Sequence, residues 1–78
     1  MSISENELKE LIASICRISV ESIHSETRFV ADLHMDSLAS LDLLTELEER
    51  HEIVISQDEA RHLQTFGKLV EHLKTREG

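Results

Sequence analysis

Residues 36–51 read DSLASLDLLTELEERH, an acidic stretch in which leucines recur at spacings of three and four residues. This repeat places them along one side of an α-helix. Asp36 is a residue favoured at the N-cap, so we predict a helix that starts there and runs to about His51. The stripe is wider than one buried face needs, so some leucines should stay near the surface as a docking patch. The leucines of the stripe are Leu38, Leu41, Leu43, Leu44 and Leu47.

The chain before this helix is expected to supply one more helix and a long connection. Ser4 and Glu7 have the spacing of a capping box, and the helix that they open should end near Arg17. Residues 19–35 then form a connection that is long for so small a domain, which is uncommon unless the connection has a function. Apolar residues within it suggest that it is held across the bundle. They are Val20, Ile23, Phe29, Val30 and Leu33.

The chain after the leucine-rich helix indicates two further helices. Ser56 and Glu59 form a second capping box, which should open a short helix over residues 57–62. Thr65 can cap a last helix with its own apolar stripe. No pair of strands is convincing, so we predict an all-α fold, an antiparallel bundle of three main helices plus one short helix. The residues expected in its core include Leu44, Leu47, Ile55, Ala60, Leu63, Phe66 and Val70.

Length and charge limit what the chain can do. With 78 residues it should form a single domain over residues 1–78, which leaves little room for an active site assembled from several elements. A free-standing enzyme is therefore not expected. Sixteen Asp and Glu face eight Lys and Arg, so the formal net charge is −8. Such a chain lacks the basic stripe that nucleic-acid binding requires, and it favours protein partners with basic patches.

The sequence gives no indication of export, a membrane span or a metal centre. Cys16 is the only cysteine and lies in the apolar pattern of the first helix, so no disulfide can form within the chain. No apolar run approaches the roughly 18 residues of a membrane span, and no signal peptide opens the chain. The five histidines lack the paired spacing of metal ligands. We expect a monomeric cytoplasmic protein without a metal site.

Chemistry is expected where Leu33-His34-Met35-Asp36-Ser37-Leu38 leads into the leucine-rich helix. A serine in this position presents its hydroxyl beside backbone N–H groups that the first turn of a helix leaves unpaired. These groups and the helix dipole favour an anion, so a phosphodiester on Ser37 would be stabilised. Taken alone, Asp36-Ser37 is better explained as a plain helix cap.

The complete pattern resembles the acyl carrier protein family. The family motif is Asp-Ser-Leu at the start of the second of four helices, with a leucine four residues before the serine, and Asp36-Ser37-Leu38 and Leu33 match it. The stretches LEERHEI and ISQDEA are similar to the family's second and third helices, so the similarity covers nearly the whole chain. The resemblance implies that a phosphopantetheinyl transferase attaches 4′-phosphopantetheine from coenzyme A to Ser37. The thiol of that arm, and not Cys16, would then carry an acyl group as a thioester.

The resemblance also implies how the carrier meets other proteins. Asp36 would help to hold the magnesium ion of the transferase, and the core would open between helices to shelter an acyl chain. Acidic residues of the leucine-rich helix would bind basic patches on the transferase and on enzymes that load or process the acyl group. A solvated helix face is the plainer explanation of the same charges. The expected docking residues are Asp36, Leu38, Leu41, Asp42, Glu46, Glu48 and Glu49.

Three positions depart from the family pattern. His34 stands where the family commonly has glycine, so its backbone should be different or mildly strained. Ala39 stands where an acidic residue often follows the motif, and His51 stands where a large apolar ring is often buried. These departures favour a specialised carrier over the housekeeping one.

The expected function is therefore that of an acyl carrier in fatty acid, polyketide or specialised lipid biosynthesis. Two alternatives stay open. The first is a carrier of amino acids, such as a peptidyl or D-alanyl carrier, against which Asp36 and the strong acidity argue. The second is an unmodified acidic interaction module that kept the bundle and lost the arm, against which the intact Ser37 argues.

Overall fold

The computed structural model describes residues 3–77, with side chains described as far as residue 75. The elements in chain order are α1 (Glu5–Cys16), the 3₁₀ turn η1 (Val20–Ser22), α2 (Ser37–His51), α3 (Gln57–Arg61) and α4 (Phe66–Glu77). The predicted all-α bundle of three main helices and a short one is confirmed. No strand occurs in the described part of the chain, where one isolated bridge joins Arg28 to Thr65.

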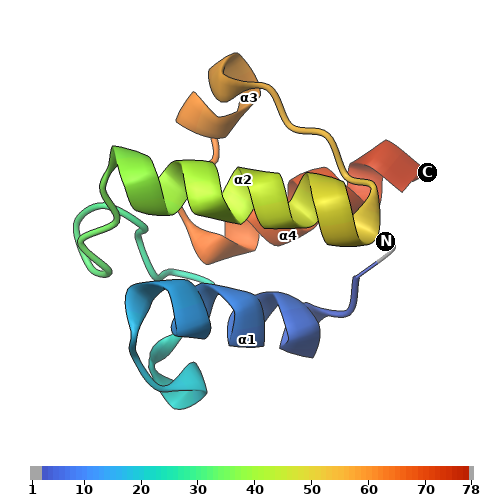
Figure 1. The fold of residues 1–78 in the computed structure, drawn as a ribbon. Helices are drawn as coiled ribbons and strands as arrows, with labels where there is room; N and C mark the ends of the chain where they lie inside the picture. Colours follow the sequence, from blue (N-terminus) through green and yellow to red (C-terminus); the bar gives the residue numbers. More distant parts are fainter. Residues whose placement is uncertain (1–2, 78) are drawn as a thin grey trace.

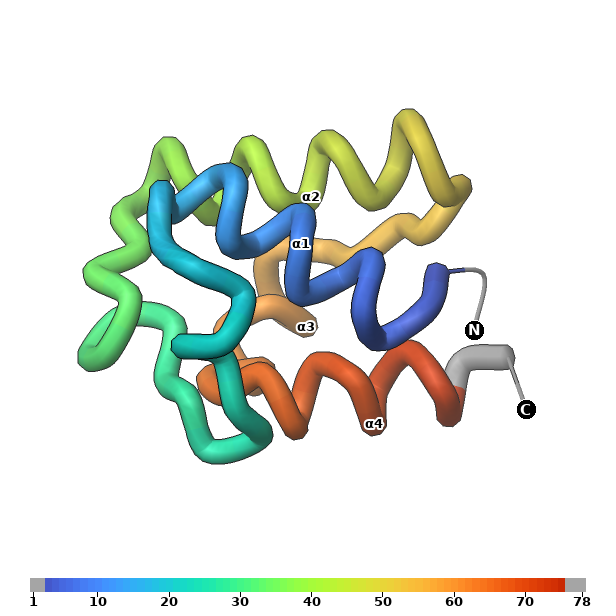
Figure 2. Tube along the Cα trace, turned by 90° about the horizontal axis from the view of Figure 1, so that it is seen from below, coloured from blue at the N-terminus to red at the C-terminus, as the bar shows by residue number. Residues whose placement is uncertain are grey.

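The helices differ in direction. Figures 1 and 2 show α1 running opposite to α2 and α4, whereas α2 and α4 run in the same direction. The segment that contains α3 carries the chain from the end of α2 back to the start of α4. The described chain enters and leaves at one end of the bundle, and α2 begins at the opposite end (Figures 1 and 2). The start of α2 is therefore far from both described ends of the chain.

The predicted capping boxes are confirmed at the starts of α1 and α3. The Ser4 hydroxyl accepts a hydrogen bond from the Glu7 N–H at 3.0 Å, and the Glu7 carboxylate accepts one from the Ser4 N–H at 3.2 Å. Ser56 and Glu59 make the same reciprocal pair, at 3.1 and 3.4 Å. These side chains satisfy N–H groups that have no partner inside the helix, which is why the helices begin there.

Left-handed residues end α1 and α2. Arg17 has φ 58° and ψ 47°, and Glu52 has φ 56° and ψ 32°. The N–H of Arg17 donates to the Ala13 carbonyl, and that of Glu52 donates to the Glu48 and Leu47 carbonyls. This αL ending satisfies carbonyl groups that the last turn leaves free and turns the chain out of the helix. It confirms the predicted ends near residues 17 and 51.

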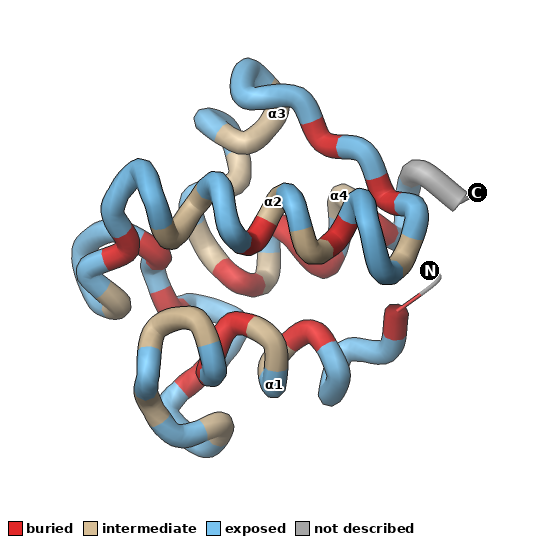
Figure 3. The backbone as a smooth tube through the Cα atoms, viewed as in Figure 1, coloured by how far each residue is buried: buried red, intermediate tan, exposed pale blue. Residues whose placement is uncertain are grey.

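The core is one cluster of apolar side chains between α1, α2 and α4. Figure 3 shows buried positions separated by exposed ones along α1 and α2, as their amphipathic patterns predict. The buried apolar residues are Ile3, Leu8, Ile12, Ala13, Ile23, Phe29, Met35, Leu43, Leu47, Ile53, Ile55, Phe66, Leu69, Val70 and Leu73. Connection residues thus share the core with the helices.

Backbone contacts fasten the 19–35 connection to the start of α4. The carbonyls of Thr27 and Ser25 accept hydrogen bonds from the N–H groups of Phe66 and Gly67, both at 2.9 Å. A Cβ on residue 67 would lie 2.9 Å from the Ser25 carbonyl oxygen, so glycine permits this close approach. The first two N–H groups of α4 therefore find acceptors in the connection rather than in water.

The side chains of the connection follow the prediction with one exception. Ile23 and Phe29 are buried, and Val20 and Leu33 pack against the core in part. Val30 is 72% exposed, so the expectation that it holds the connection against the bundle was wrong. Residues 29–33 form a turn, and this turn directs Val30 outward. The 3₁₀ turn at residues 20–22 was also not predicted.

Candidate functional site

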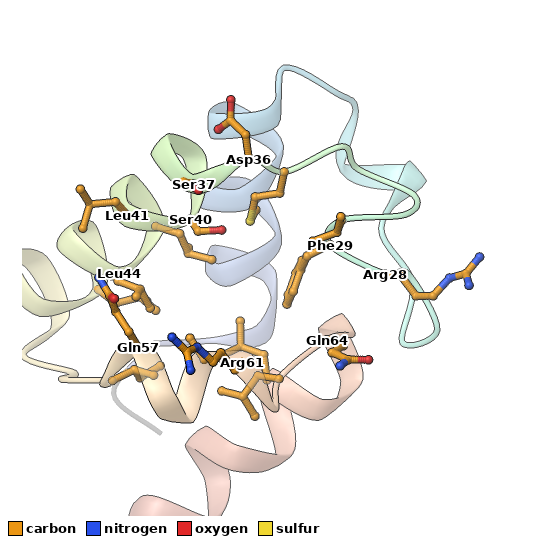
Figure 4. A pocket seen from close by; sticks show the side chains of 18 of the residues that line it. Arg28, Phe29, Asp36, Ser37, Ser40, Leu41, Leu44, Gln57, Arg61 and Gln64 are labelled. Atoms are coloured by element: carbon orange, nitrogen blue, oxygen red, sulfur yellow. The ribbon is translucent and has the colours of Figure 1, made fainter.

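Asp36 sets the start of α2 and thereby the position of Ser37. Its carboxylate accepts a hydrogen bond from the Ala39 N–H at 2.8 Å, and its carbonyl accepts one from the Ser40 N–H at 2.9 Å. Ser37 is the first residue of the helix and is exposed (Figure 4). A helix offers no internal acceptor to the N–H groups of its first residues, so those of Ser37 and Leu38 remain for an anion.

The turn before Ser37 holds His34 in the left-handed region, at φ 54°. The strained backbone expected at this position is thus confirmed. The His34 N–H donates to the Val30 carbonyl at 3.1 Å, and the Met35 N–H donates to the Phe29 carbonyl at 2.9 Å. These bonds fold the turn back on itself and bury Met35 directly before the N-cap. The turn therefore fixes where the helix, and with it Ser37, begins.

A second carboxylate supports the same turn. The Asp32 carboxylate accepts a hydrogen bond from the Arg28 N–H at 2.8 Å and lies 3.5 Å from the Arg28 Nε. The bond from this backbone N–H is the main reason that the pKa of Asp32 is lowered from its usual value. The ionised carboxylate is thus part of the turn that precedes the site.

A cavity of about 730 Å³ opens beside Ser37 between α2, α3 and the connection (Figure 4). This volume lies within the roughly 300–1,000 Å³ of typical small-molecule sites. The buried residues Leu47, Ile55 and Leu69 contribute an apolar inner wall. Further apolar side chains line the cavity together with polar ones, which include Ser40, Gln57, Arg61 and Gln64.

The cavity changes the interpretation of three residues that were expected in the packed core. Leu44, Ala60 and Leu63 are only partly buried, because one side of each lines the cavity. The sequence pattern places them on the inner faces of their elements, and this much was correct. It cannot tell an inner face that is packed from one that faces a void, because both need the same apolar residues.

The predicted docking residues lie along α2. Leu38 and Leu41 are 72% and 51% exposed, which confirms that they are on the outer side near Ser37. Asp36, Asp42, Glu48 and Glu49 are exposed as well. Glu46 differs from them, because it is half-buried and its carboxylate lies 2.7 Å from the Arg50 Nε.

The sequence did not indicate that some residues belong to the site. Phe29 and Met35 line the cavity from the connection, and Gln57 and Arg61 line it from α3. Their roles depend on how the connection and α3 fold over α2, which local spacing does not encode. His51, which the sequence singled out, is half-buried at the end of α2.

The other reactive side chain is Cys16, at the end of α1. It is partly buried and packs against the core. Burial raises the pKa of its thiol, so the thiol stays protonated at neutral pH and is a poor nucleophile. Within the described residues, no cluster of three or more His, Cys, Asp or Glu side chains could bind a metal ion. None of the helices described here has the length and apolar character needed to cross a membrane.

Comparison with known proteins agrees with this geometry. The family model for the phosphopantetheine attachment site matches residues 6–73, which defines the class as a carrier with a covalently attached phosphopantetheine. The chain is 31% identical over 74 residues to an acyl carrier protein of Chlamydia caviae, covering 95% of this chain and 96% of the relative. It is 33% identical to the acyl carrier proteins of Wolinella succinogenes and Lactobacillus acidophilus, covering 90% and 94% of this chain and 92% and 91% of theirs. The chain therefore belongs to the acyl carrier protein family, whose members carry intermediates and do not catalyse reactions.

Proposed function

We propose that this protein carries acyl groups as thioesters on a 4′-phosphopantetheine arm attached to Ser37. The observation that supports this most directly is the location of Ser37, exposed at the start of α2 and at the edge of a partly apolar cavity. An exposed hydroxyl can be reached by a transferase. A cavity beside it can receive what the arm carries.

The residues around Ser37 fit a phosphodiester. Asp36 caps the helix through the Ala39 N–H. The N–H groups of Ser37 and Leu38, which the first turn of a helix leaves without an internal acceptor, would stabilise a phosphate on the serine. We propose that the exposed carboxylate of Asp36 also helps to hold the magnesium ion of the transferase, since carboxylate oxygens are preferred magnesium ligands. The arm supplies a terminal thiol that forms the thioester.

The inner wall of the cavity favours an acyl group over an aminoacyl group. Leu47, Ile55 and Leu69 offer apolar surface, and each buried methylene of an acyl chain gains about 0.8 kcal/mol. An ammonium group placed against the same wall would lose its hydration without gaining a partner. We therefore propose an aliphatic acyl cargo, in fatty acid, polyketide or specialised lipid biosynthesis. The departures at His34, Ala39 and His51 favour a specialised pathway.

We further propose that partner enzymes bind the acidic face of α2. Leu38 and Leu41 provide an apolar centre, and the carboxylates around them attract basic patches. Partners would be a phosphopantetheinyl transferase and enzymes that load or process the acyl group. The protein would act as a monomeric single domain over residues 1–78.

Mass spectrometry after incubation with coenzyme A, magnesium and a broad-range transferase tests the attachment. We expect the wild type to gain one phosphopantetheine and Ser37→Ala to gain none, with unchanged circular dichroism because the side chain is exposed. Ser40→Ala, one turn further along α2, is the matched control and should still be modified. Modification of Ser37→Ala would assign the arm to another residue. An unmodified wild type would favour the interaction module that lost its arm.

A further inference from the structure

The short helix α3 forms one wall of the cavity without burying any of its residues fully. Gln57, Ala60 and Arg61 line the cavity, and none of the five residues of α3 is buried. Helices shorter than about 12 residues are marginal in water by themselves. The position of α3 over the cavity therefore depends on contacts with the rest of the bundle.

One such contact joins α3 to α4. His72 Nε2 lies 2.8 Å from Glu59 Oε2, and the two residues are 13 positions apart on different helices. Their side chains are 28% and 38% exposed, so this pair is partly shielded from water. A shielded bond to a carboxylate is stronger than a fully exposed one.

The same Glu59 carboxylate also belongs to the start of α3. Its other oxygen accepts a hydrogen bond from the Ser56 N–H at 3.4 Å, and the Glu59 N–H donates to the Ser56 hydroxyl at 3.1 Å. The carboxylate that completes the cap of α3 is thus the one that binds α4. Loss of the His72 contact would remove a bond that joins the first turn of α3 to α4.

We infer that His72 and Glu59 form a clasp that holds α3 closed over the cavity and slows the exit of an acyl chain from it. This inference rests on the proposed function for its cargo. Neither side chain of the clasp lines the cavity. Both are therefore positioning residues, which act on the cargo through α3. The clasp sets how long the thioester stays sheltered.

Amide hydrogen exchange in the protein without the arm tests the clasp itself. His72→Leu keeps the bulk of the side chain and removes the hydrogen bond. Exchange of the amides of Ala60 in α3 and of His62 at its C-cap should therefore rise about tenfold, while that of α1 should not change. His72→Gln places an amide N–H near the former Nε2 and should restore most of the protection. His24→Leu, at an exposed histidine of the connection, is the control. Unchanged α3 exchange in His72→Leu would overturn the clasp.

Thioester reactivity then tests the effect on the cargo. With an octanoyl group on the arm, His72→Leu should react with hydroxylamine several-fold faster than the wild type, whereas acetyl forms, too short to reach the inner wall, should react equally. His72→Gln should again resemble the wild type. Equal octanoyl rates in wild type and His72→Leu would overturn the inference that the clasp slows the exit of the acyl chain. If Ser37 accepted no arm, the proposed function would fail, and the exchange measurement would still decide whether the clasp exists.

Discussion

His34 has a φ of 54°, which lies in the left-handed region. This conformation costs free energy for any residue that has a side chain. The left-handed region costs a non-glycine residue about 1–2 kcal/mol, whereas glycine enters it freely. Glycine loses about 0.5–1 kcal/mol more chain entropy on folding, which offsets part of the gain. We expect His34→Gly to raise the free energy of unfolding by up to about 1 kcal/mol, measured by urea denaturation. His34→Val should lower it, because a β-branched residue is poorly tolerated there. A less stable His34→Gly would show that the His34 side chain makes a compensating contact.

The thiol of Cys16 gives a second prediction at the residue scale. Its raised pKa means that little thiolate is present at neutral pH, so a disulfide reagent should react with the unmodified protein more slowly than with free cysteine. After attachment of the arm, one fast-reacting thiol should appear. Cys16→Ala should keep this fast thiol and lose only the slow one. A fast reaction of the unmodified wild type would contradict the shielding of Cys16.

At the scale of elements, the capping box of α1 makes stability depend on pH. The Ser4 N–H, and after it the Ser4 hydroxyl, lower the pKa of Glu7 from its usual 4.5. A pKa that is lower in the folded chain stabilises the fold above the unfolded value, and this contribution is lost as the pH falls through the folded value. We expect thermal unfolding between about pH 3 and pH 6 to show a smaller acid-induced loss of stability in Glu7→Gln than in the wild type.

Glu10→Gln is the control for this pH dependence. Glu10 is exposed on the same helix and lies outside the capping box, and its replacement removes the same charge. The control also corrects for the relief of self-repulsion as carboxylates become protonated. If Glu7→Gln and Glu10→Gln had the same pH profile, the box would contribute no pH dependence.

The acidic face of α2 gives a prediction about association. Asp42→Lys or Glu48→Lys should slow binding to the transferase by up to roughly tenfold, because exposed opposite charges steer encounter. Added salt should slow the wild type as well, since charges farther apart than about 10 Å are screened at 0.1 M. Stopped-flow kinetics with Glu10→Lys, the same charge change on α1, separates a local effect from net charge. If the association rate changed neither with salt nor with charge reversal, these carboxylates would be a solvated face without a role in docking.

Patterns between residues close in the sequence predicted the helices. The cavity and the position of α3 depend on contacts between residues far apart in the sequence. The boxes at Ser4 and Ser56 involve residues three apart, so the sequence displays them directly. The exposed Leu38 and the strained His34 also followed from the sequence, through helical spacing and the family motif. The cavity and the His72–Glu59 contact depend on how α3 lies against α2 and α4. No periodicity within one element encodes that arrangement.

At the scale of the whole molecule, net charge acts on stability. Arg50 lies 2.7 Å from Glu46 and Arg61 lies 3.6 Å from Asp58, but both arginines are more than 70% exposed. Exposed pairs contribute about 0–1 kcal/mol, so they do not offset the repulsion that follows from a net charge of −8. We expect salt or modest magnesium to raise the melting temperature measured by circular dichroism.

Charge reversal tests the same repulsion without added ions. Glu49→Lys should raise the melting temperature and reduce the gain from salt, because it removes a carboxylate next to Glu48 and makes the net charge less negative. Lys9, whose Nζ lies 5.8 Å from the centre of the Phe66 ring, is one cation that interacts with an aromatic face. A melting temperature that is flat or falls with salt would show that local pairs already balance the charge.

Both described ends of the chain lie together, at the end of the bundle away from the start of α2 (Figures 1 and 2). The molecule thus has an anchoring pole and a working pole. A label, a solid support or a neighbouring domain joined at either end would be held away from Ser37, leaving the approach of a large enzyme unhindered. The same arrangement suits fusion in tandem, where several copies on one polypeptide would each present the serine outward, and it suits circular permutation, where a short linker would join the old ends.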